Sequence, residues 1–267
     1  MSQNFAFSHT KHNGDFPANT GHYHNMYEIY FLKTGSCRYF IGDRLFHIAE
    51  GDIVLISKGI IHKSLYPDAP VERYLINFTD DMIPDEISGD MKKLFQQSIY
   101  HTPKESAGDI LTIFKKIERE TNSPDKYSPL VTTGLLTELL TYILRHPSDK
   151  AEMVSNLPIE NVPSYIAGHY REQLTLENMA EMCSLSTSYF SRLFKNITGF
   201  GFKEYLTMLR LKEAQSLLMH TDLSICKVAY ECGFNDSNYF SVVFKELIGL
   251  SPLKYRKQNR IKDKKHG

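Results

Sequence analysis

The segment YFSRLFK at residues 189–195 returns as YFSVVFK at residues 239–245, and each copy is followed by a glycine, Gly199 or Gly249. Two further identities lie upstream, Ala180 with Ala229 and Cys183 with Cys232. The offset is 50 residues between the two segments and 49 between the upstream identities. A one-residue change in a loop between preserved flanks is typical of a duplicated structural unit.

Each copy has the pattern of two helices joined by a tight turn. In the first copy, Thr175 can cap a helix from 176 to 183, and Ser186 or Thr187 can cap a second helix that Gly199 ends in the left-handed conformation. The corresponding residues of the second copy are Ser224, Asp236 and Gly249. We therefore predict two helix-turn-helix units, at residues 175–199 and 224–249.

The outward faces of the second helices carry short polar and basic side chains. If the aromatic residues face inward, the residues left outside are Ser188, Ser191, Arg192 and Lys195 in the first unit and Asn238, Ser241, Val242 and Lys245 in the second. They include no acid, and their hydrogen-bonding groups and cations suit base edges and phosphates. A helix-turn-helix unit places such a helix in the major groove of double-stranded DNA.

The connection between the units predicts how far apart they lie. The residues from Phe202 to Leu218 form one amphipathic pattern of 17 residues, which as a helix would be roughly 25 Å long. Adding the half-widths of two small modules brings the distance between the second helices of the two units, the recognition helices, close to the roughly 34 Å between successive major-groove faces. One chain could therefore contact two turns of the same duplex.

At these residues the chain resembles the AraC/XylS family of bacterial transcription regulators, from about residue 158 to 258. The matching elements are Leu176-x-x-x-Ala180, Ser188-x-Phe190-Ser191-x-x-Phe194-Lys195, Arg210-Leu211-x-x-Ala214, Ile225-x-x-Val228-Ala229-x-x-x-Gly233-Phe234 and Gly249-x-Ser251-Pro252. The resemblance implies base contacts at Ser188, Ser191, Arg192, Asn238 and Ser241. Val242 stands where the first unit has Arg192, so we expect the second unit to contact bases weakly, through a thymine methyl at most.

Composition agrees with a DNA-binding function at one end of the chain. The 267 residues carry no net charge, but residues 1–156 hold 16 basic against 20 acidic residues, and residues 157–267 hold 15 against 11. This asymmetry favours nucleic-acid binding by the second part and its basic tail, 259–267. No apolar stretch has the length of a membrane span and no signal peptide is recognisable, so we expect a cytoplasmic bacterial protein without a membrane partner.

The N-terminal third has the pattern of an antiparallel β-barrel. Short β-rich runs are predicted at 26–33, 37–41, 44–48, 53–56 and 71–78, with turns between them. Together with the C-terminal helices they predict an α+β protein. Its expected domains are an effector-binding barrel (1–85), a helical segment (86–148), a linker (149–157) and an all-α DNA-binding domain (158–258).

The predicted barrel contains a cluster of possible metal ligands. His22, His24 and Glu28 have the same parity and would project to one face of an extended chain, where His62 could join them. The spacing from His22 to Gly35 resembles the first cupin metal motif. Gly51 and His62 fit the second motif, but Ser57 and Tyr66 depart from it. The resemblance implies a cupin-like barrel, and three histidines with one glutamate could hold manganese, iron, nickel or zinc.

Three interpretations of these polar residues remain open. They could line an effector pocket without a metal, hold a divalent metal, or be satisfied by hydrogen bonds with no further role. The candidate effector residues are His22, His24, Glu28, Tyr30, Tyr39 and His62. Aromatic side chains stack well on sugar rings, which makes a carbohydrate the first hypothesis for the effector.

Two apolar helices are predicted between the barrel and the linker, at 107–121 and 130–144. The second is apolar over more than one face, so it either packs within its own domain or forms a homodimer interface.

The sequence thus predicts a ligand-responsive transcription regulator, activator or repressor, with DNA, a small molecule and a second copy as partners. If the protein is an activator, RNA polymerase would be a further partner. The sequence contains no catalytic motif, and we do not expect the protein to be an enzyme. The rival hypotheses are a metal-dependent cupin enzyme and a constitutive, dimeric DNA-binding protein.

Overall fold

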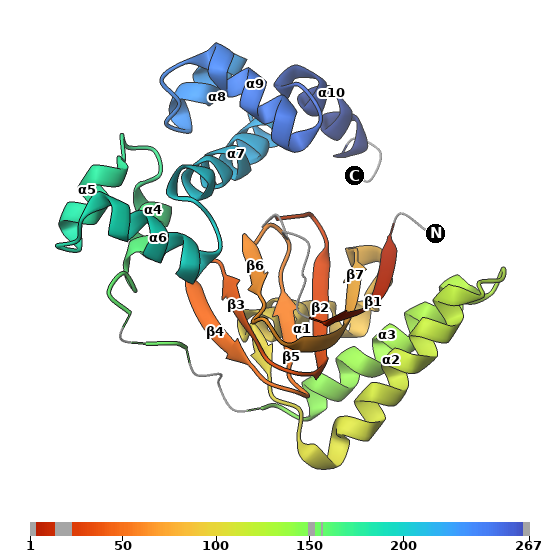
Figure 1. Ribbon diagram of the computed structural model, residues 1–267. Coiled ribbons are helices and arrows are strands. Elements are labelled where there is room, and N and C mark those ends of the chain that lie inside the picture. Colours follow the sequence, from red (N-terminus) through yellow and green to blue (C-terminus); the bar gives the residue numbers. More distant parts are fainter. Residues whose placement is uncertain (1–3, 14–22, 149–152, 156, 264–267) are drawn as a thin grey trace. The chain divides into compact units, whose positions relative to one another are not determined.

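In the computed structural model, the described residues are 4–13, 23–148, 153–155 and 157–263. Contacts divide the chain into two compact units, Met1–Ser155 and Asn156–Gly267, and each is considered by itself (Figure 1). Among the described helices, none combines the length and the apolar character that a membrane crossing requires.

Two antiparallel sheets form the first unit. The five-stranded sheet has the order β1-β7-β2-β5-β8 and the three-stranded sheet has the order β4-β3-β6. The strand bounds are β1 (Phe5–Asn13), β2 (Tyr27–Thr34), β3 (Cys37–Ile41), β4 (Arg44–Ile48), β5 (Ile53–Ile56), β6 (His62–Leu65), β7 (Pro70–Phe78) and β8 (Ile99–Tyr100). The predicted α+β class is confirmed.

Side-chain alternation decides what each face of the five-stranded sheet contacts. On β2, Tyr30 and Leu32 point toward the three-stranded sheet and join a core cluster with Tyr39, Phe46 and other residues of that sheet. Ile29 and Phe31 point the other way, into a second cluster beneath the helices. Both faces of β2 are therefore buried, and the strand lacks the polar alternation of an exposed sheet.

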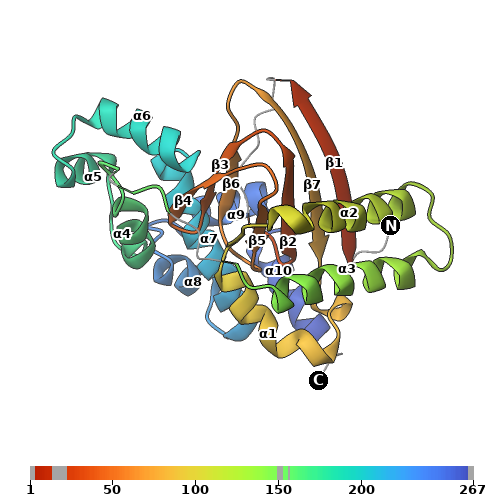
Figure 2. The ribbon, with the colours of Figure 1, turned by 90° about the horizontal axis from the view of Figure 1, so that it is seen from below.

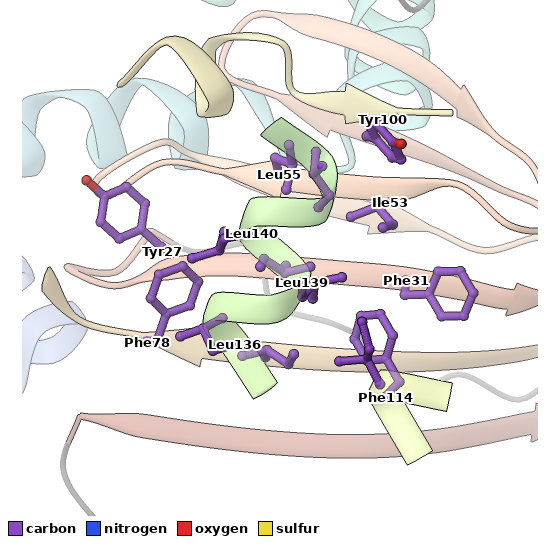
Figure 3. Close-up of a cluster of buried hydrophobic side chains, with 14 of the residues drawn as sticks. Tyr27, Phe31, Ile53, Leu55, Phe78, Tyr100, Phe114, Leu136, Leu139 and Leu140 are labelled. Carbon is purple, nitrogen blue, oxygen red and sulfur yellow. The ribbon is translucent and has the colours of Figure 1, made fainter. Parts of the chain in front are cut away.

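Three helices cover the second face: α1 (Asp85–Gln96), α2 (Ala107–Asn122) and α3 (Ser128–Arg145). Figure 2 shows α2 and α3 lying side by side as a hairpin. Figure 3 shows how Leu136, Leu139 and Leu140 of α3 face the sheet, where they pack in one cluster with Tyr27 and Phe114. The helices and the sheet thus share one hydrophobic core.

Several elements of this unit lie outside the sequence prediction. The predicted β-runs match β2, β3, β4, β5 and β7 to within a residue at each end, but β1, β6 and β8 were not expected, and α1 was covered only by the broad helical segment at 86–148. β1 begins with three apolar residues, Phe5 to Phe7, and continues with polar ones such as His9 and Lys11, so its sequence lacks the alternation of a half-buried strand. It forms a strand because it pairs along its whole length with β7. Helix α1 buries few apolar side chains, and these are Met91, Leu94 and Phe95.

Over its described residues, 157–263, the second unit contains seven helices: α4 (Val162–His169), α5 (Leu176–Met182), α6 (Thr187–Thr198), α7 (Phe202–His220), α8 (Ile225–Glu231), α9 (Ser237–Ile248) and α10 (Pro252–Asp263). The apolar pattern from Val162 to Glu172 also predicts a helix, and the structure ends that helix, α4, at His169. Part of the expected linker lies outside the described residues, but Met153 and Val154 pair with β4, where the Val154 amide donates to the Leu45 carbonyl at 2.9 Å.

Candidate nucleic-acid interface and ligand pocket

The two recognition helices, α6 and α9, are built alike. The Ser186 hydroxyl accepts the Tyr189 amide at 3.4 Å, and the Asp236 carboxylate accepts the Asn238 and Tyr239 amides at 2.6 and 3.1 Å. Both helices end at a left-handed glycine, with φ of 80° at each. Caps at both ends satisfy backbone groups that a short helix would otherwise leave to water.

An aromatic pair anchors each of these helices. Phe190 and Phe194 of α6 are fully buried, with ring centroids 5.7 Å apart. Phe240 and Phe244 hold the same positions in α9, at 5.5 Å. Residues four apart lie on one side of a helix, so burying these pairs forces the opposite side outward.

All eight predicted contact residues lie on that outer side. Ser188, Arg192 and Lys195 of α6 are exposed, as are Asn238, Val242 and Lys245 of α9, whereas Ser191 and Ser241 are partly buried. The Ser241 hydroxyl donates to the Ser237 carbonyl at 2.9 Å, so what it can offer to a base is its lone pairs.

The aromatic residues of both recognition helices were expected to face inward, and for one tyrosine in each helix that expectation is wrong. Tyr189 is 46% exposed and Tyr239 is 59% exposed. Each precedes the first buried phenylalanine of its helix, and thus lies outside the three- and four-residue spacing of the buried side. Helical spacing, rather than aromatic character, indicates that these tyrosines are exposed. Their hydroxyls are further candidates for phosphate contacts.

A short segment between α4 and α5 ties the second helix-turn-helix unit to the rest of its domain. Arg210 of α7 donates to the carbonyls of Tyr170 and Glu172, at 2.8 Å each. The Gln173 and Asn235 side chains exchange two hydrogen bonds, at 2.7 and 2.9 Å. These contacts hold the turn between α8 and α9 in place, and with it the direction of α9.

Gly233, in that turn, is the point of closest approach. Its φ is +86°, and a Cβ atom would lie 2.7 Å from the Arg171 carbonyl oxygen and 2.9 Å from the Tyr170 carbonyl oxygen. Both obstacles are backbone atoms, which cannot move aside as a side chain can.

In the first unit, an acid and two histidines meet between the sheets. Glu28 and His62 are buried and His24 is partly exposed. The Glu28 Oε2 atom lies 3.1 Å from His24 Nε2 and 3.6 Å from His62 Nε2. These three of the four predicted metal ligands are thus brought together, with ligand atoms all within 4.8 Å of one another. His22 lies outside the described residues.

Hydrogen bonds fix the orientation of both rings. His24 Nδ1 donates to the Met26 carbonyl at 3.0 Å, and His62 Nδ1 donates to the Ile60 carbonyl at 2.7 Å. Each Nε2 atom therefore points at Glu28 and either carries a proton toward it or offers a lone pair to a cation. Two imidazoles and a carboxylate are a donor set that suits a divalent metal such as zinc.

The same acid is also satisfied by neutral donors. The Tyr39 hydroxyl donates to Glu28 Oε1 at 2.9 Å, and the Asn77 amide donates to Oε2 at 3.1 Å. Burial alone would raise the pKa of the Glu28 carboxyl, but hydrogen bonds and charge from His24 and His62 outweigh it, and the pKa lies well below its ordinary value. Burial lowers the pKa of His62, but Glu28 more than compensates and raises it overall. The pair therefore favours its charged forms.

A small cavity of about 60 Å³ adjoins this cluster. Four of the predicted effector residues line it, namely Glu28, Tyr30, Tyr39 and His62. Lys63, Ser64, Tyr66, Arg73 and Leu75 also line it and were not predicted. Arg73 lies two residues from Val71 and from Leu75 on β7, so side-chain alternation places all three on the face toward the three-stranded sheet. This pattern could have identified Arg73 from the sequence.

Known proteins resemble both units of the chain. A family model described as a helix-turn-helix domain matches residues 179–258, and one described as an AraC-like ligand binding domain matches residues 9–140. The transcriptional activator RhaR of Mannheimia succiniciproducens is 25% identical over 245 residues, 88% of this chain and 86% of that protein. The Msm operon regulatory protein of Streptococcus mutans is 27% identical over 240 residues, 87% and 84% of the two chains.

A solved structure, the DNA-binding domain of AdpA in complex with a target DNA, is 31% identical. It covers 39% of this chain and 95% of that chain, with a TM-score of 0.38.

We expect Gly233→Ala to cost more than about 3 kcal/mol of unfolding free energy, because it adds a backbone clash to the left-handed strain. Gly249→Ala is the matched control: its φ of +80° is as strained, but nothing lies within 4 Å of its Cβ. That variant should lose about 1 kcal/mol. Urea unfolding of both variants measures the difference, and equal losses would contradict the close approach.

Proposed function

Because the chain belongs to the AraC family of transcription regulators, we propose that α6 and α9 contact successive major grooves of one DNA duplex while the first unit holds a small-molecule effector. The chain is a sequence-specific DNA-binding regulator, and its relatives are regulators rather than enzymes. One observation carries it: the outer side of α6 carries small polar and basic residues without an acid, and that of α9 carries Asn238, Ser241 and Lys245 beside one exposed acid, Glu246.

The side chains divide by the chemistry that they offer. Arg192 has the planar donor pair that matches a guanine edge, and Lys195 and Lys245 suit phosphates. Ser188, Ser191, Asn238 and Ser241 supply short hydrogen-bonding groups for base edges or the backbone. Val242 is 55% exposed and can contact a thymine methyl at most. The first unit should therefore contribute more to base discrimination than the second.

Helix α7 sets the distance between the two contacts. Its 19 residues make it roughly 28 Å long, close to the spacing of successive major grooves once the width of the modules is added. Arg210 and the Gln173–Asn235 pair then hold the second recognition helix in register with α7.

In the first unit, the cavity beside the buried Glu28 supports a sensor role. A protein that bound DNA constitutively would gain nothing from a buried, charged cluster that costs desolvation. RhaR is by name a transcriptional activator, and we extend activation to this chain, with RNA polymerase as its partner. Such a regulator would act in the bacterial cytoplasm.

We also propose that α3 forms a homodimer interface. Its inner side is buried in the core, yet Tyr127, Leu130 and Val131 at its start are exposed, and Leu130 is 76% exposed. Apolar side chains three and four residues apart form a stripe that a second copy of the helix could cover.

A second candidate role for the first unit is metal binding at His24, Glu28 and His62. The ring orientations favour it, because both Nε2 atoms converge on the carboxylate. A bound metal would supply a site where a ligand oxygen could coordinate. The protein's own residues would hold it, with Tyr39 and Asn77 orienting Glu28.

The DNA contacts can be separated by substitution. Arg192→Ala should cost about 1–3 kcal/mol on an operator selected from random DNA and should relax preference at one base pair. Lys245→Ala should weaken binding to operator and random DNA alike, because a phosphate contact carries no sequence information. Fluorescence anisotropy with both DNAs measures this. An equal loss on both DNAs for Arg192→Ala would refute its role in base recognition.

For the dimer, Leu130→Glu should convert a dimer to a monomer in sedimentation experiments, since it places a charge in the proposed apolar interface. The side chain is exposed, so the fold should not be disturbed. Met182→Glu, at another exposed apolar residue of the chain (47% exposed), should leave the dimer intact. A wild-type chain that is monomeric at about 100 μM would exclude this interface as a stable one.

For the metal, titration with Zn²⁺ followed by elemental analysis should give one ion per chain. His62→Gln should weaken binding by at least about tenfold, whereas His47→Gln, at an exposed histidine of β4, should not. Stoichiometric zinc binding that persists in His62→Gln, or no zinc binding at all, would contradict a metal site at His24, Glu28 and His62.

A further inference from the structure

Arg73 is a partly buried basic side chain that lines the cavity between the two sheets of the first unit. It follows Val71 and precedes Leu75 on β7, and both neighbours pack in the cluster between the two sheets. Its guanidinium carbon lies 5.6 Å from the centroid of the Tyr30 ring. Within the described part of the chain, its Nε atom is buried and has no hydrogen-bond acceptor.

The cavity offers this guanidinium no free carboxylate. Among the described residues that line it, Glu28 is the one acid, and its two oxygens already accept hydrogen bonds from Tyr39, His24 and Asn77. The neighbouring Glu72 has the opposite parity and binds Lys33 and His9 on the other side of the sheet. A guanidinium in such surroundings is costly unless an anion meets it.

The positive charge of Arg73 reaches the polar groups around the cavity. Burial raises the pKa of the Tyr66 hydroxyl, and Arg73 is the largest influence that acts to lower it. Burial likewise raises the pKa of the Cys37 thiol to about 12, and the Arg73 charge acts against that rise. Lys63 adds a second cation to the lining. This part of the interior therefore favours an anion.

The size of the cavity limits what the anion can be. A volume of about 60 Å³ corresponds to roughly two water molecules, which suits a single carboxylate group better than a whole sugar ring. A guanidinium binds a carboxylate through two parallel hydrogen bonds. Ser64 and Tyr66, which also line the cavity, have hydroxyls that can donate to the same group.

We propose that the effector is a small organic acid whose carboxylate is held by Arg73 in the cavity between the two sheets. This inference rests on the proposed sensor function and replaces the carbohydrate suggested by the aromatic residues. Arg73 provides the charge and the fork geometry, Tyr30 supports the guanidinium from one side, and the Glu28–His62 cluster forms the far wall.

The test uses matched acids and amides with the full-length protein: acetate against acetamide, and malonate against malonamide, at constant ionic strength, with glucose as a neutral sugar. A ligand that binds only the folded state raises the melting temperature. We expect at least one acid to raise it and its amide not to. The rise should persist in EDTA, because Arg73 rather than a metal holds the carboxylate.

Three variants locate the effect. Arg73→Gln should weaken acid binding at least about tenfold, and Arg73→Lys should retain part of it, since it keeps the charge without the planar fork. Arg44→Gln removes the same charge from an exposed residue of the first unit and should change nothing. The Lys variant also controls for folding, since it preserves a cation in the cavity.

Each contrary result has its own meaning. Stabilisation by amides or glucose but by no acid would overturn the organic-acid class and leave the sensor function standing. Acid binding unchanged in Arg73→Gln would overturn the role of Arg73, and no stabilisation by any acid would overturn the proposal. Acid binding that requires Arg73 but leaves operator affinity unchanged would support the inference and remove the sensor function instead.

Discussion

Burial of one aromatic pair in each recognition helix determines what the helix can present to DNA. Phe190 with Phe194, and Phe240 with Phe244, are fully buried. They fix the rotation of α6 and α9 about their axes, and this leaves Arg192 and Asn238 on the outer sides. The caps at Ser186 and Asp236 fix where each helix begins. Substituting an aromatic residue would therefore disturb recognition without touching a contact residue.

The first unit depends on a different constraint, the alternation of side chains along β2 and β7. Because both strands lie in the middle of the five-stranded sheet, every second residue faces the three-stranded sheet. This brings Glu28 and Tyr30 of β2 beside Arg73 and Asn77 of β7. The alternation of side chains thus places a carboxylate, a phenol, a guanidinium and an amide in one interior, where low polarity strengthens each interaction. The helices on the other face complete the core without reaching this cluster.

The sequence predicted the helical unit more completely than the barrel, for a physical reason. Helix caps and three- and four-residue spacing are local signals, so α6, α8 and α9 could be placed almost to the residue. Strand β1 and the short β6 exist because of partners distant in the sequence, which local patterns do not record. Aromatic character predicted a buried position for Tyr189, which is wrong. The candidate ligand residues were chosen around the histidines and did not include Arg73, although side-chain alternation along β7 indicates which face it lies on.

The central claim is that one chain contacts two successive turns of DNA on the same side. Methylation interference on a selected operator tests it directly, with the Leu130→Glu chain used so that a single copy is bound. Two clusters of interfering guanines or adenines, about 10 base pairs apart, are predicted, and Arg192→Ala should abolish signals in one cluster alone. A single cluster, or two clusters about half a helical turn apart, would contradict the account.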